Sequence, residues 1–212
     1  MTKFIIVRHG YSVANKEKRF SGQMDIPLDE VGLCQAQSVA DYIVENFKVD
    51  SIYTSDLIRT VQTVKPTAER LGLAINKCKE LREVDVGSWQ GRLVEDIKNE
   101  YPEDFEIYLK TPGLSRFGDG ENHAECLNRA KEFLDKLAEE NEGKTIVIGT
   151  HGGVIRALRA YLKNIPMDRI QELAHVPNAS ITIIEYNEGL INLVEEGYSE
   201  HLSDKTTEAP IK

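Results

Sequence analysis

Three short stretches of the chain are rich in apolar residues and carry no charged side chain: 4–7 (FIIV), 51–54 (SIYT) and 145–149 (TIVIG). Apolar runs of this length are typical of strands that are buried on both faces of a parallel sheet. Between them, apolar residues recur at helical spacing in residues 36–47, 58–71, 127–137 and 154–162, and Pro66 is expected to kink or divide the second of these helices. Strands that alternate with amphipathic helices predict an α/β fold, a three-layer α/β/α domain with a mainly parallel sheet.

Two further apolar stretches, 181–186 and 190–195, flank a glycine-containing turn at residues 187–189. This pattern predicts an antiparallel hairpin at the edge of the sheet, near the C-terminus. Residues from about 93 to 125 do not fit the alternation of strands and helices, and we interpret them as an insertion that forms a lid over the active site. We therefore predict a single domain over residues 1–198 and a polar tail over residues 199–212.

The charge and the cysteines exclude several classes of function. The 212 residues carry a formal net charge of −9, and their basic residues are scattered, so we expect no nucleic-acid partner. No apolar stretch is long enough for a transmembrane helix, so we expect no membrane partner. Cys34, Cys78 and Cys126 form no CxxC pair and show no metal-ligand spacing, which favours a reducing, cytoplasmic location and predicts no metal site.

Basic and histidine side chains gather where the predicted strands end. Arg8 and His9 follow the first apolar run, Arg59 follows the second, and His151 follows the run at 145–149. Ligands of open α/β sheets bind at the carboxyl ends of the strands, so we expect these four side chains at one edge of the sheet. Arginine forks match phosphate oxygens, and the helices that begin near residues 56 and 152 point their N-terminal amides at the same edge. The sequence therefore predicts a site for a phosphate monoester.

Several ordered blocks of the sequence resemble those of one enzyme family. The blocks are residues 8–10 (RHG), 20–23 (FSGQ), 25–28 (DIPL), 55–63 (SDLIRTVQT), 81–91 (LREVDVGSWQG) and 150–156 (THGGVIR). A lone RHG is weak evidence, whereas several blocks in order, from residue 4 to about 186, are specific. The chain is identified as a member of the histidine phosphatase superfamily, the phosphoglycerate-mutase-like enzymes.

The resemblance implies roles for the residues at the strand ends. His9 is expected to be the nucleophile, and Arg8, Arg59 and a protonated His151 are expected to hold the phosphoryl oxygens. A neutral imidazole nitrogen can attack phosphorus to form a phosphohistidine, which splits one hard step into two easier ones. The family's chemistry needs no metal and no cofactor.

Four further positions are expected to bind substrate. Asn15 matches a family position whose amide contacts the phosphate, although an asparagine that hydrogen-bonds its own backbone is a competing interpretation. Ser21 and Gly22 match a stretch that lines the pocket, and Gly152 allows close approach of the backbone to the ligand.

One carboxyl group is expected to act as general acid and base. By motif position this is Glu83, and Glu80 and Asp85 are nearby competitors. Of the remaining histidines, His175 is interpreted as ordering the loop that follows it. His123 is interpreted as a surface residue, although the insertion could bring it to the pocket.

Phosphatases and mutases of the family share the nucleophile. Mutases use additional Tyr, Lys and paired Arg residues, whereas this chain has Val86 and Val94 at the corresponding places and contains no Arg-Arg pair. We therefore predict a phosphomonoester hydrolase that acts on a small phosphorylated metabolite as a monomer or homodimer. The alternative is a 2,3-bisphosphoglycerate-dependent phosphoglycerate mutase. A regulatory phosphate-binding domain without catalysis is disfavoured, because all the catalytic positions are filled.

Overall fold

The computed structural model describes residues 1–117, 119–187 and 189–205. Its centre is a six-stranded sheet with the order β3-β2-β4-β1-β5-β6. The strands are β1 (Thr2–Arg8), β2 (Ser51–Ser55), β3 (Ile75–Cys78), β4 (Thr145–Thr150), β5 (Ile181–Asn187) and β6 (Leu190–Tyr198). The four strands from β3 to β1 are parallel, and β5 and β6 add an antiparallel hairpin at one edge. The predicted fold class is confirmed; of the predicted turn, Glu188 lies outside the described residues.

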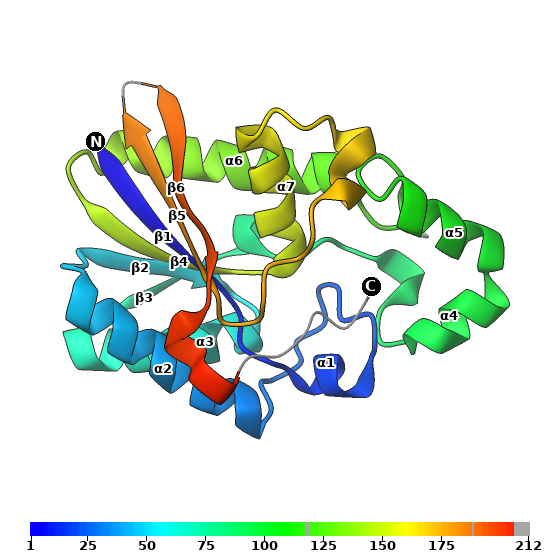
Figure 1. Ribbon diagram of the computed structural model, residues 1–212, viewed down its shortest axis with the longest axis horizontal. Coiled ribbons are helices and arrows are strands. Elements are labelled where there is room, and N and C mark those ends of the chain that lie inside the picture. The colour runs from blue at the N-terminus through cyan, green and yellow to red at the C-terminus, as the bar shows by residue number, and fades with distance from the viewer. Residues whose placement is uncertain (118, 188, 206–212) are drawn as a thin grey trace.

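The sheet is covered by helices on both faces, which makes three layers (Figure 1). Alternate residues of a strand point to opposite faces, and β1 sends Phe4 and Ile6 to one face and Ile5 and Val7 to the other. Helices α6 (His123–Glu140) and α7 (Gly152–Leu162) pack on the first face. Helices α2 (Glu30–Asn46) and α3 (Ile58–Leu71) pack on the second. Burial on both faces explains why β1 is a continuous apolar run.

Two elements differ from the sequence prediction. Helix α3 runs without interruption through Pro66, whose ring is buried, so the helix is not divided there. Strand β3 was not predicted, because the sequence INKC lacks an apolar run: the strand lies at the edge of the sheet, and its two central residues, Asn76 and Lys77, are exposed. A short helix, α1 (Val13–Glu17), also follows β1 and is held by a capping box between Ser12 and Asn15.

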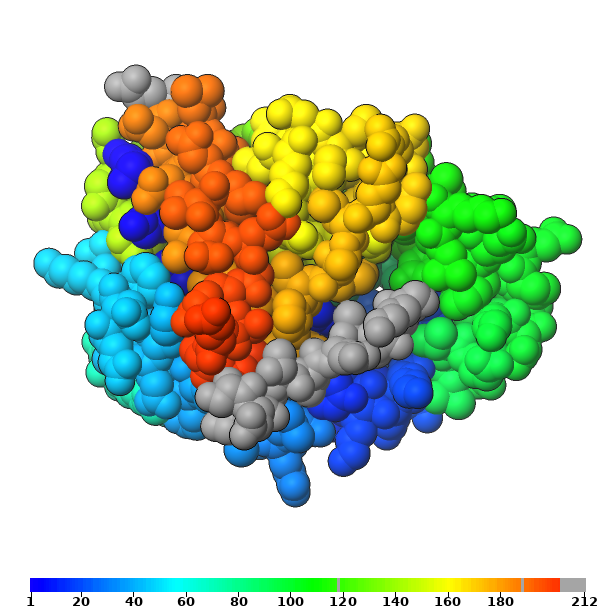
Figure 2. All heavy atoms as spheres, in the orientation of Figure 1, coloured from blue at the N-terminus to red at the C-terminus, as the bar shows by residue number. Residues whose placement is uncertain are grey.

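The insertion forms two helices beside the sheet, α4 (Val94–Glu100) and α5 (Pro102–Lys110). They lie at the right of Figure 1, beyond the carboxyl ends of the parallel strands. Tyr108 of α5 contacts Phe20 and Trp89 of the main domain, and Phe117 of the insertion, edge to face. In Figure 2 the green surface of these helices adjoins the yellow surface of the connection that contains the 3₁₀ helix η3 (Met167–Glu172). The insertion therefore has its own apolar contacts with the main domain.

Residues just beyond the predicted domain boundary pack on the domain. The 3₁₀ helix η4 (Glu200–Lys205) lies against α2, with Leu202 fully buried and His201 stacked on Tyr42 at a ring-centroid distance of 5.4 Å. The boundary predicted at residue 198 thus leaves out a packed turn, and residues 206–212 of the predicted tail lie outside the described residues. Within the described chain, no helix is long and apolar enough to cross a membrane.

Candidate active site

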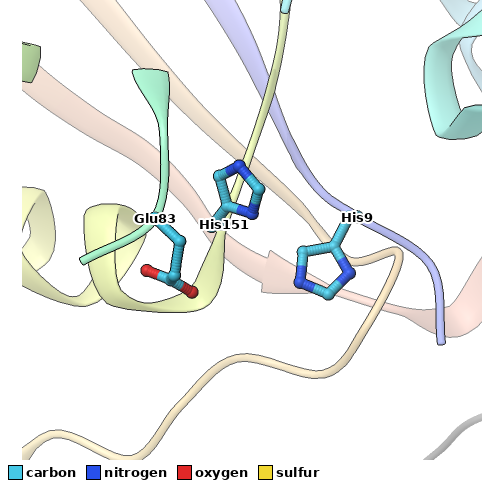
Figure 3. A group of neighbouring side chains, drawn as sticks. All are labelled: His9, Glu83 and His151. Atoms are coloured by element: carbon cyan, nitrogen blue, oxygen red, sulfur yellow. The ribbon is translucent and has the colours of Figure 1, made fainter. Parts of the chain in front are cut away.

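The parallel pairing of β1 with β4 places two histidines side by side. Arg8 pairs with Thr150 at the ends of the two strands, so His9 and His151 follow at adjacent positions, with ring centroids 5.3 Å apart. Glu83 reaches the same point from the segment after the 3₁₀ helix η1 (Lys79–Leu81) (Figure 3). One nitrogen of each ring and one carboxylate oxygen of Glu83 all lie within 4.8 Å of one another. The structure thus brings together three residues that are far apart in sequence.

The ring of His9 is held in one orientation by the backbone. Its Nδ1 lies 2.7 Å from the carbonyl oxygen of Gly10; because that oxygen can only accept, Nδ1 carries the proton and Nε2 has a free lone pair. Burial, assisted by the charges of Arg59 and Arg8, holds the pKa of His9 well below its usual range. The neutral ring is the form that can attack phosphorus.

His151 is oriented by Arg59. The Nε–H of Arg59 donates to His151 Nδ1 at 3.2 Å, so the proton of the neutral ring lies on Nε2. That Nε2 is buried and has no hydrogen-bond partner among the residues that the structure describes. Burial and the charge of Arg59 hold the pKa of His151 well below its usual range. The neutral ring already offers an N–H donor, and the protonated His151 expected from the sequence stays a prediction.

The two arginines of the site differ in what they contact. Arg59 donates to the carbonyl oxygens of Met24 at 2.8 Å and Gly22 at 2.7 Å, so it fixes this loop as well as His151. Arg8 donates to the carbonyl of Val176, while its Nε is buried and finds no partner within the described part of the chain. Burial lowers the pKa of each arginine to about 10, and both remain charged at neutral pH.

The carboxylate of Glu83 sits at the start of α7. Its Oε1 accepts from the backbone amides of Gly153 at 3.0 Å and Val84 at 2.9 Å. The side chains of Arg129 and Gln23 hold its backbone carbonyl, at 2.9 and 3.2 Å. The carboxylate is thereby fixed on one oxygen, and Oε2 receives only a longer contact of 3.3 Å from Gly153.

The two competing carboxylates lie elsewhere. Asp85 accepts from the amide of Gly87 at 2.9 Å, within its own turn. Glu80 borders a different hollow, next to Tyr53 and Phe133. Of the three acidic residues considered from the sequence, Glu83 alone lines the pocket that contains His9.

The expected substrate-binding positions line the same pocket. The Oδ1 of Asn15 accepts from the Ser12 amide and the Asn178 side chain, which leaves its Nδ2 as the group that can face a ligand. One side-chain atom of Asn15 thus caps α1, and the contact of its amide with phosphate stays a prediction. Gly22 adopts a φ of +45°, and a side chain there would overlap Val86 at 2.8 Å.

His175 lines the pocket as well, which the sequence did not suggest. Arg156 contacts its Nε2 at 3.2 Å; since the guanidinium donates, Nδ1 carries the proton of His175. That Nδ1 is buried without a partner among the described residues, and a Cβ on Gly152 would meet it at 3.3 Å and the unpartnered Nε of Arg8 at 3.2 Å. Burial and Arg156 hold the pKa of His175 well below its usual range. Two buried donors without a partner among the described residues are suited to hold an anion.

His123 is not a surface residue, contrary to the sequence interpretation. Its ring is 4% exposed, donates from Nδ1 to the carbonyl of Pro112 at 2.8 Å, and lines the pocket. Tyr108 and Phe117 line the same side. The insertion thus supplies one wall of the pocket.

The spacing of His9, Glu83 and His151 would suit a cation, but their surroundings favour an anion. The guanidinium groups of Arg8 and Arg59 lie beside them, and two fixed positive charges repel a metal ion. The same charges with the N–H donors attract a phosphoryl group.

Comparison with known proteins gives the family. A model of the histidine phosphatase superfamily (branch 1) matches residues 4–197. The chain belongs to the histidine phosphatase superfamily. It is 32% identical to phosphoserine phosphatase 1 of Hydrogenobacter thermophilus, over 99% of this chain and 98% of that protein. It is 29% identical to phosphoglycerate mutase-like protein 4 of Arabidopsis thaliana, over 88% and 80%. The solved structure of Bacillus stearothermophilus YhfR matches with a TM-score of 0.91 and 30% identity, over 96% of this chain and 100% of that chain.

The family prediction is thus confirmed, and one departure from its pattern has a local explanation. Many histidine phosphatases have Gly-Glu-Ser where this chain has Gly120-Glu121-Asn122. Asn122 is the N-cap of α6 and forms a capping box with Glu125, at 2.9 and 3.0 Å. Serine and asparagine are about equally good N-caps, so the exchange keeps the start of the helix intact.

Proposed function

We propose that this histidine phosphatase hydrolyses small phosphomonoesters through a phosphohistidine at His9, with Glu83 as general acid and base. The observation that carries the proposal is the hydrogen bond from His9 Nδ1 to Gly10, which leaves Nε2 unprotonated at the point where Glu83 and His151 converge. A nucleophile, a proton donor and a phosphoryl-binding group are thereby within reach of one phosphorus atom.

The first step transfers the phosphoryl group to the enzyme. The lone pair of His9 Nε2 attacks phosphorus, a P–N bond forms, and the P–O bond to the alcohol breaks. The departing oxygen takes a proton from Glu83, whose Oε2 is less occupied by backbone amides than Oε1. Protonation of a poor leaving group by a positioned acid contributes about 10²–10⁴-fold to such a rate.

The second step returns the enzyme to its starting state. Glu83, now ionised, accepts a proton from a water molecule that attacks phosphorus, and the P–N bond breaks. Inorganic phosphate leaves, His9 regains its lone pair, and Glu83 is protonated again. One carboxyl group therefore serves as acid and then as base, in the same position.

The phosphoryl oxygens need donors that are already in place. Arg8 Nε, His151 Nε2 and the side-chain amide of Asn15 are the groups we assign to them, and Gly152 offers an amide at the first turn of α7. Arg59 acts mainly by holding His151 and the loop at Gly22. Preorganised donors of this kind stabilise the charge of the transition state without reorganisation. Ser21 completes the wall beside Gly22.

Hydrolysis is favoured over mutase chemistry by the pocket wall. Val86 lines the pocket, so an apolar side chain stands where a mutase has a polar one. Val94 packs against the apolar core instead and has no part in the pocket wall. The phosphoserine phosphatase relative, which matches over nearly its full length, supports the same conclusion.

The proposal also includes the insertion and the setting. Residues 93–125 act as a lid whose side chains His123, Tyr108 and Phe117 close over the substrate. The enzyme works as a monomer or homodimer in the cytoplasm, where its three free cysteines stay reduced.

The test is an assay of 3-phosphoglycerate and other phosphomonoesters in EDTA, with and without 2,3-bisphosphoglycerate. We expect inorganic phosphate to be released and no 2-phosphoglycerate to form. Formation of 2-phosphoglycerate that depends on bisphosphoglycerate would make the protein a mutase. Loss of phosphate release in EDTA, restored by a divalent cation, would replace the phosphohistidine route with a metal mechanism.

A further inference from the structure

We propose that Arg129 is a positioning residue for the general acid Glu83, and that Glu121, at the end of the insertion, orients Arg129 for this task. Arg129 acts through the backbone of residues 80–85 (the acid segment), and it is not one of the described residues that line the pocket at His9. The inference rests on the proposed function and deepens it, because it gives the insertion a part in placing the proton donor.

The guanidinium of Arg129 holds the acid segment at two points. Arg129 lies on α6; its Nη1 donates to the carbonyl of Glu80 at 2.6 Å, and its Nη2 donates to the carbonyl of Glu83 at 2.9 Å. A second donor to the Glu83 carbonyl, Nε2 of Gln23, is farther away, at 3.2 Å. At the other end of the same residue, the carboxylate of Glu83 accepts from the amide of Gly153 at 3.0 Å. Arg129 therefore fixes the backbone from which the acid group extends.

Glu121 fixes the orientation of the guanidinium. Its two carboxylate oxygens accept from Nε and Nη2 of Arg129, at 3.1 and 2.5 Å, and the two side chains are 18% and 23% exposed. Burial acts to lower the pKa of Arg129, but the hydrogen bond to Glu121 raises it above its ordinary value, so the guanidinium stays charged. A bidentate pair holds the planar guanidinium in one orientation. Nη1 and Nη2 are thereby directed at the two carbonyls of the acid segment.

The end of the insertion also lies directly against the acid segment. The amide of Glu121 donates to the carbonyl of Asp85 at 2.8 Å, and the amide of Asp85 donates to Oε1 of Glu121 at 3.0 Å. Gly120 allows this close approach, because a Cβ there would lie 2.1 Å from the Asp85 carbonyl oxygen and 2.7 Å from the amide nitrogen of Gly87. Glu121 thus holds the acid segment by two routes, one direct and one through Arg129.

A positioning role and a purely structural role predict different kinetics. Loss of a structural contact lowers the amount of folded enzyme, which lowers kcat/KM for every substrate by the same factor. Displacement of the acid lowers kcat/KM only for substrates whose leaving oxygen must be protonated. The ratio of kcat/KM for two such esters does not depend on the folded fraction, so it separates the two roles.

The experiment uses two esters with different leaving groups and Glu83→Gln as the reference for loss of the acid. The alkoxide of glycerol 3-phosphate leaves only with a proton, whereas the phenoxide of p-nitrophenyl phosphate needs little protonation. We expect Arg129→Gln to lower kcat/KM for glycerol 3-phosphate by about 10- to 100-fold, and for p-nitrophenyl phosphate by less than about threefold, since a misplacement of about 1 Å can cost 10²-fold. Arg129→Lys keeps the charge but not the fork, so it should recover part of the loss.

The part played by Glu121 is tested by a double variant. Glu121→Gln keeps an oxygen acceptor for the Asp85 amide but weakens the pair with Arg129, so it should show a smaller loss of the same selective kind. Because both side chains act on the same segment, Arg129→Gln/Glu121→Gln should lose little more than Arg129→Gln alone. The matched control is Lys131→Gln, which removes another ion pair of α6, with Asp135 at 2.6 Å, and should leave the ratio of the two kcat/KM values unchanged.

The possible outcomes separate this inference from the proposed function. If Glu83→Gln shows the selective loss but Arg129→Gln lowers both kcat/KM values equally, or neither, the inference is overturned and the phosphatase function stands. Losses of Arg129→Gln and Glu121→Gln that multiply in the double variant would overturn the role given to Glu121. If the wild-type enzyme releases phosphate from neither ester, the proposed function fails, and this inference fails with it.

Discussion

Replacing Gly153 by alanine should displace the general acid without unfolding the enzyme. A methyl group at Gly153 would overlap Oε1 of Glu83 and lie 2.7 Å from Cγ2 of Val84. The carboxylate is the end of a flexible side chain, and it must retreat by about 1 Å to reach an ordinary contact of 3.4 Å. A helical alanine in place of glycine otherwise favours α7 by about 1 kcal/mol, which offsets the local strain.

We expect Gly153→Ala to lower the catalytic rate. A misplacement of about 1 Å in a reacting group can lower a rate by roughly 10²-fold, which corresponds to about 2.7 kcal/mol of transition-state free energy. We expect kcat/KM for glycerol 3-phosphate to fall by about this factor. For p-nitrophenyl phosphate, whose leaving group needs little protonation, kcat/KM should fall much less.

The assay is steady-state kinetics on the two substrates, with thermal unfolding as the control for folding. Glu83→Gln serves as the matched comparison, because it removes the acid and keeps the size of the side chain. If Gly153→Ala lowers kcat/KM equally for both substrates, or for neither, the contact between Gly153 and Glu83 does not position a general acid.

Three further outcomes follow from the site. The buried His9, His151 and His175 have pKa values held well below 6.5, so the unfolded chain binds protons that the folded chain does not as pH falls through this value. Each of these histidines should lower the free energy of unfolding by up to about 1.4 kcal/mol per pH unit below 6.5. The melting temperature should therefore drop between about pH 7 and pH 5. A melting temperature that does not change with pH in this range would contradict the burial of neutral rings. His175→Gln keeps an acceptor for Arg156 but loses the donor beside Arg8, so it should weaken inhibition by orthovanadate about three- to tenfold. His175→Asn should weaken the inhibition less. Equal inhibition of the wild-type enzyme and the two variants would remove His175 from the anion site. Gly152→Ala, whose methyl group would meet Arg8 and His175 at 3.2 and 3.3 Å, should raise KM more than it lowers kcat, and the reverse pattern would show that this wall does not hold the phosphate.

The elements best predicted from the sequence are those with strong local patterns. The runs at 4–7 and 145–149 became β1 and β4, because strands buried on both faces must be apolar throughout. Strand β3 escaped prediction because it lies at the sheet edge and exposes Asn76 and Lys77, so it has no apolar run. An apolar run in the sequence therefore indicates a strand that is buried on both faces. It gives little signal for a strand at the edge of the sheet.

Helix α3 shows a second limit of local reasoning. Proline disfavours a helix interior by about 3 kcal/mol in isolation. Here Pro66 is buried, and its neighbours Val64 and Ala68 pack under the sheet, so tertiary burial outweighs the local cost.

The site was predictable where residues follow strand ends. Arg8 ends β1, His9 and His151 come directly after β1 and β4, and the topology then fixes their proximity. His123 and His175 were misjudged because their burial depends on how the insertion and the segment before β5 fold back over the sheet edge. No spacing in the sequence reports that contact. The one available signal was a histidine next to a glycine-rich or proline-rich turn. This signal does not separate a histidine that lines the pocket from one at the surface.

The most direct test of the account is to quench the enzyme during turnover and map the phosphoryl group by mass spectrometry. Glu83→Gln with p-nitrophenyl phosphate is the suitable combination, because this leaving group needs little protonation in the first step, whereas the second step has lost its base and the intermediate accumulates. The account predicts an acid-labile, base-stable phosphoryl group on the peptide that contains His9, and none in His9→Ala. A phosphoryl group on another residue, or turnover of substrate with no phosphorylated enzyme at any time, would contradict it.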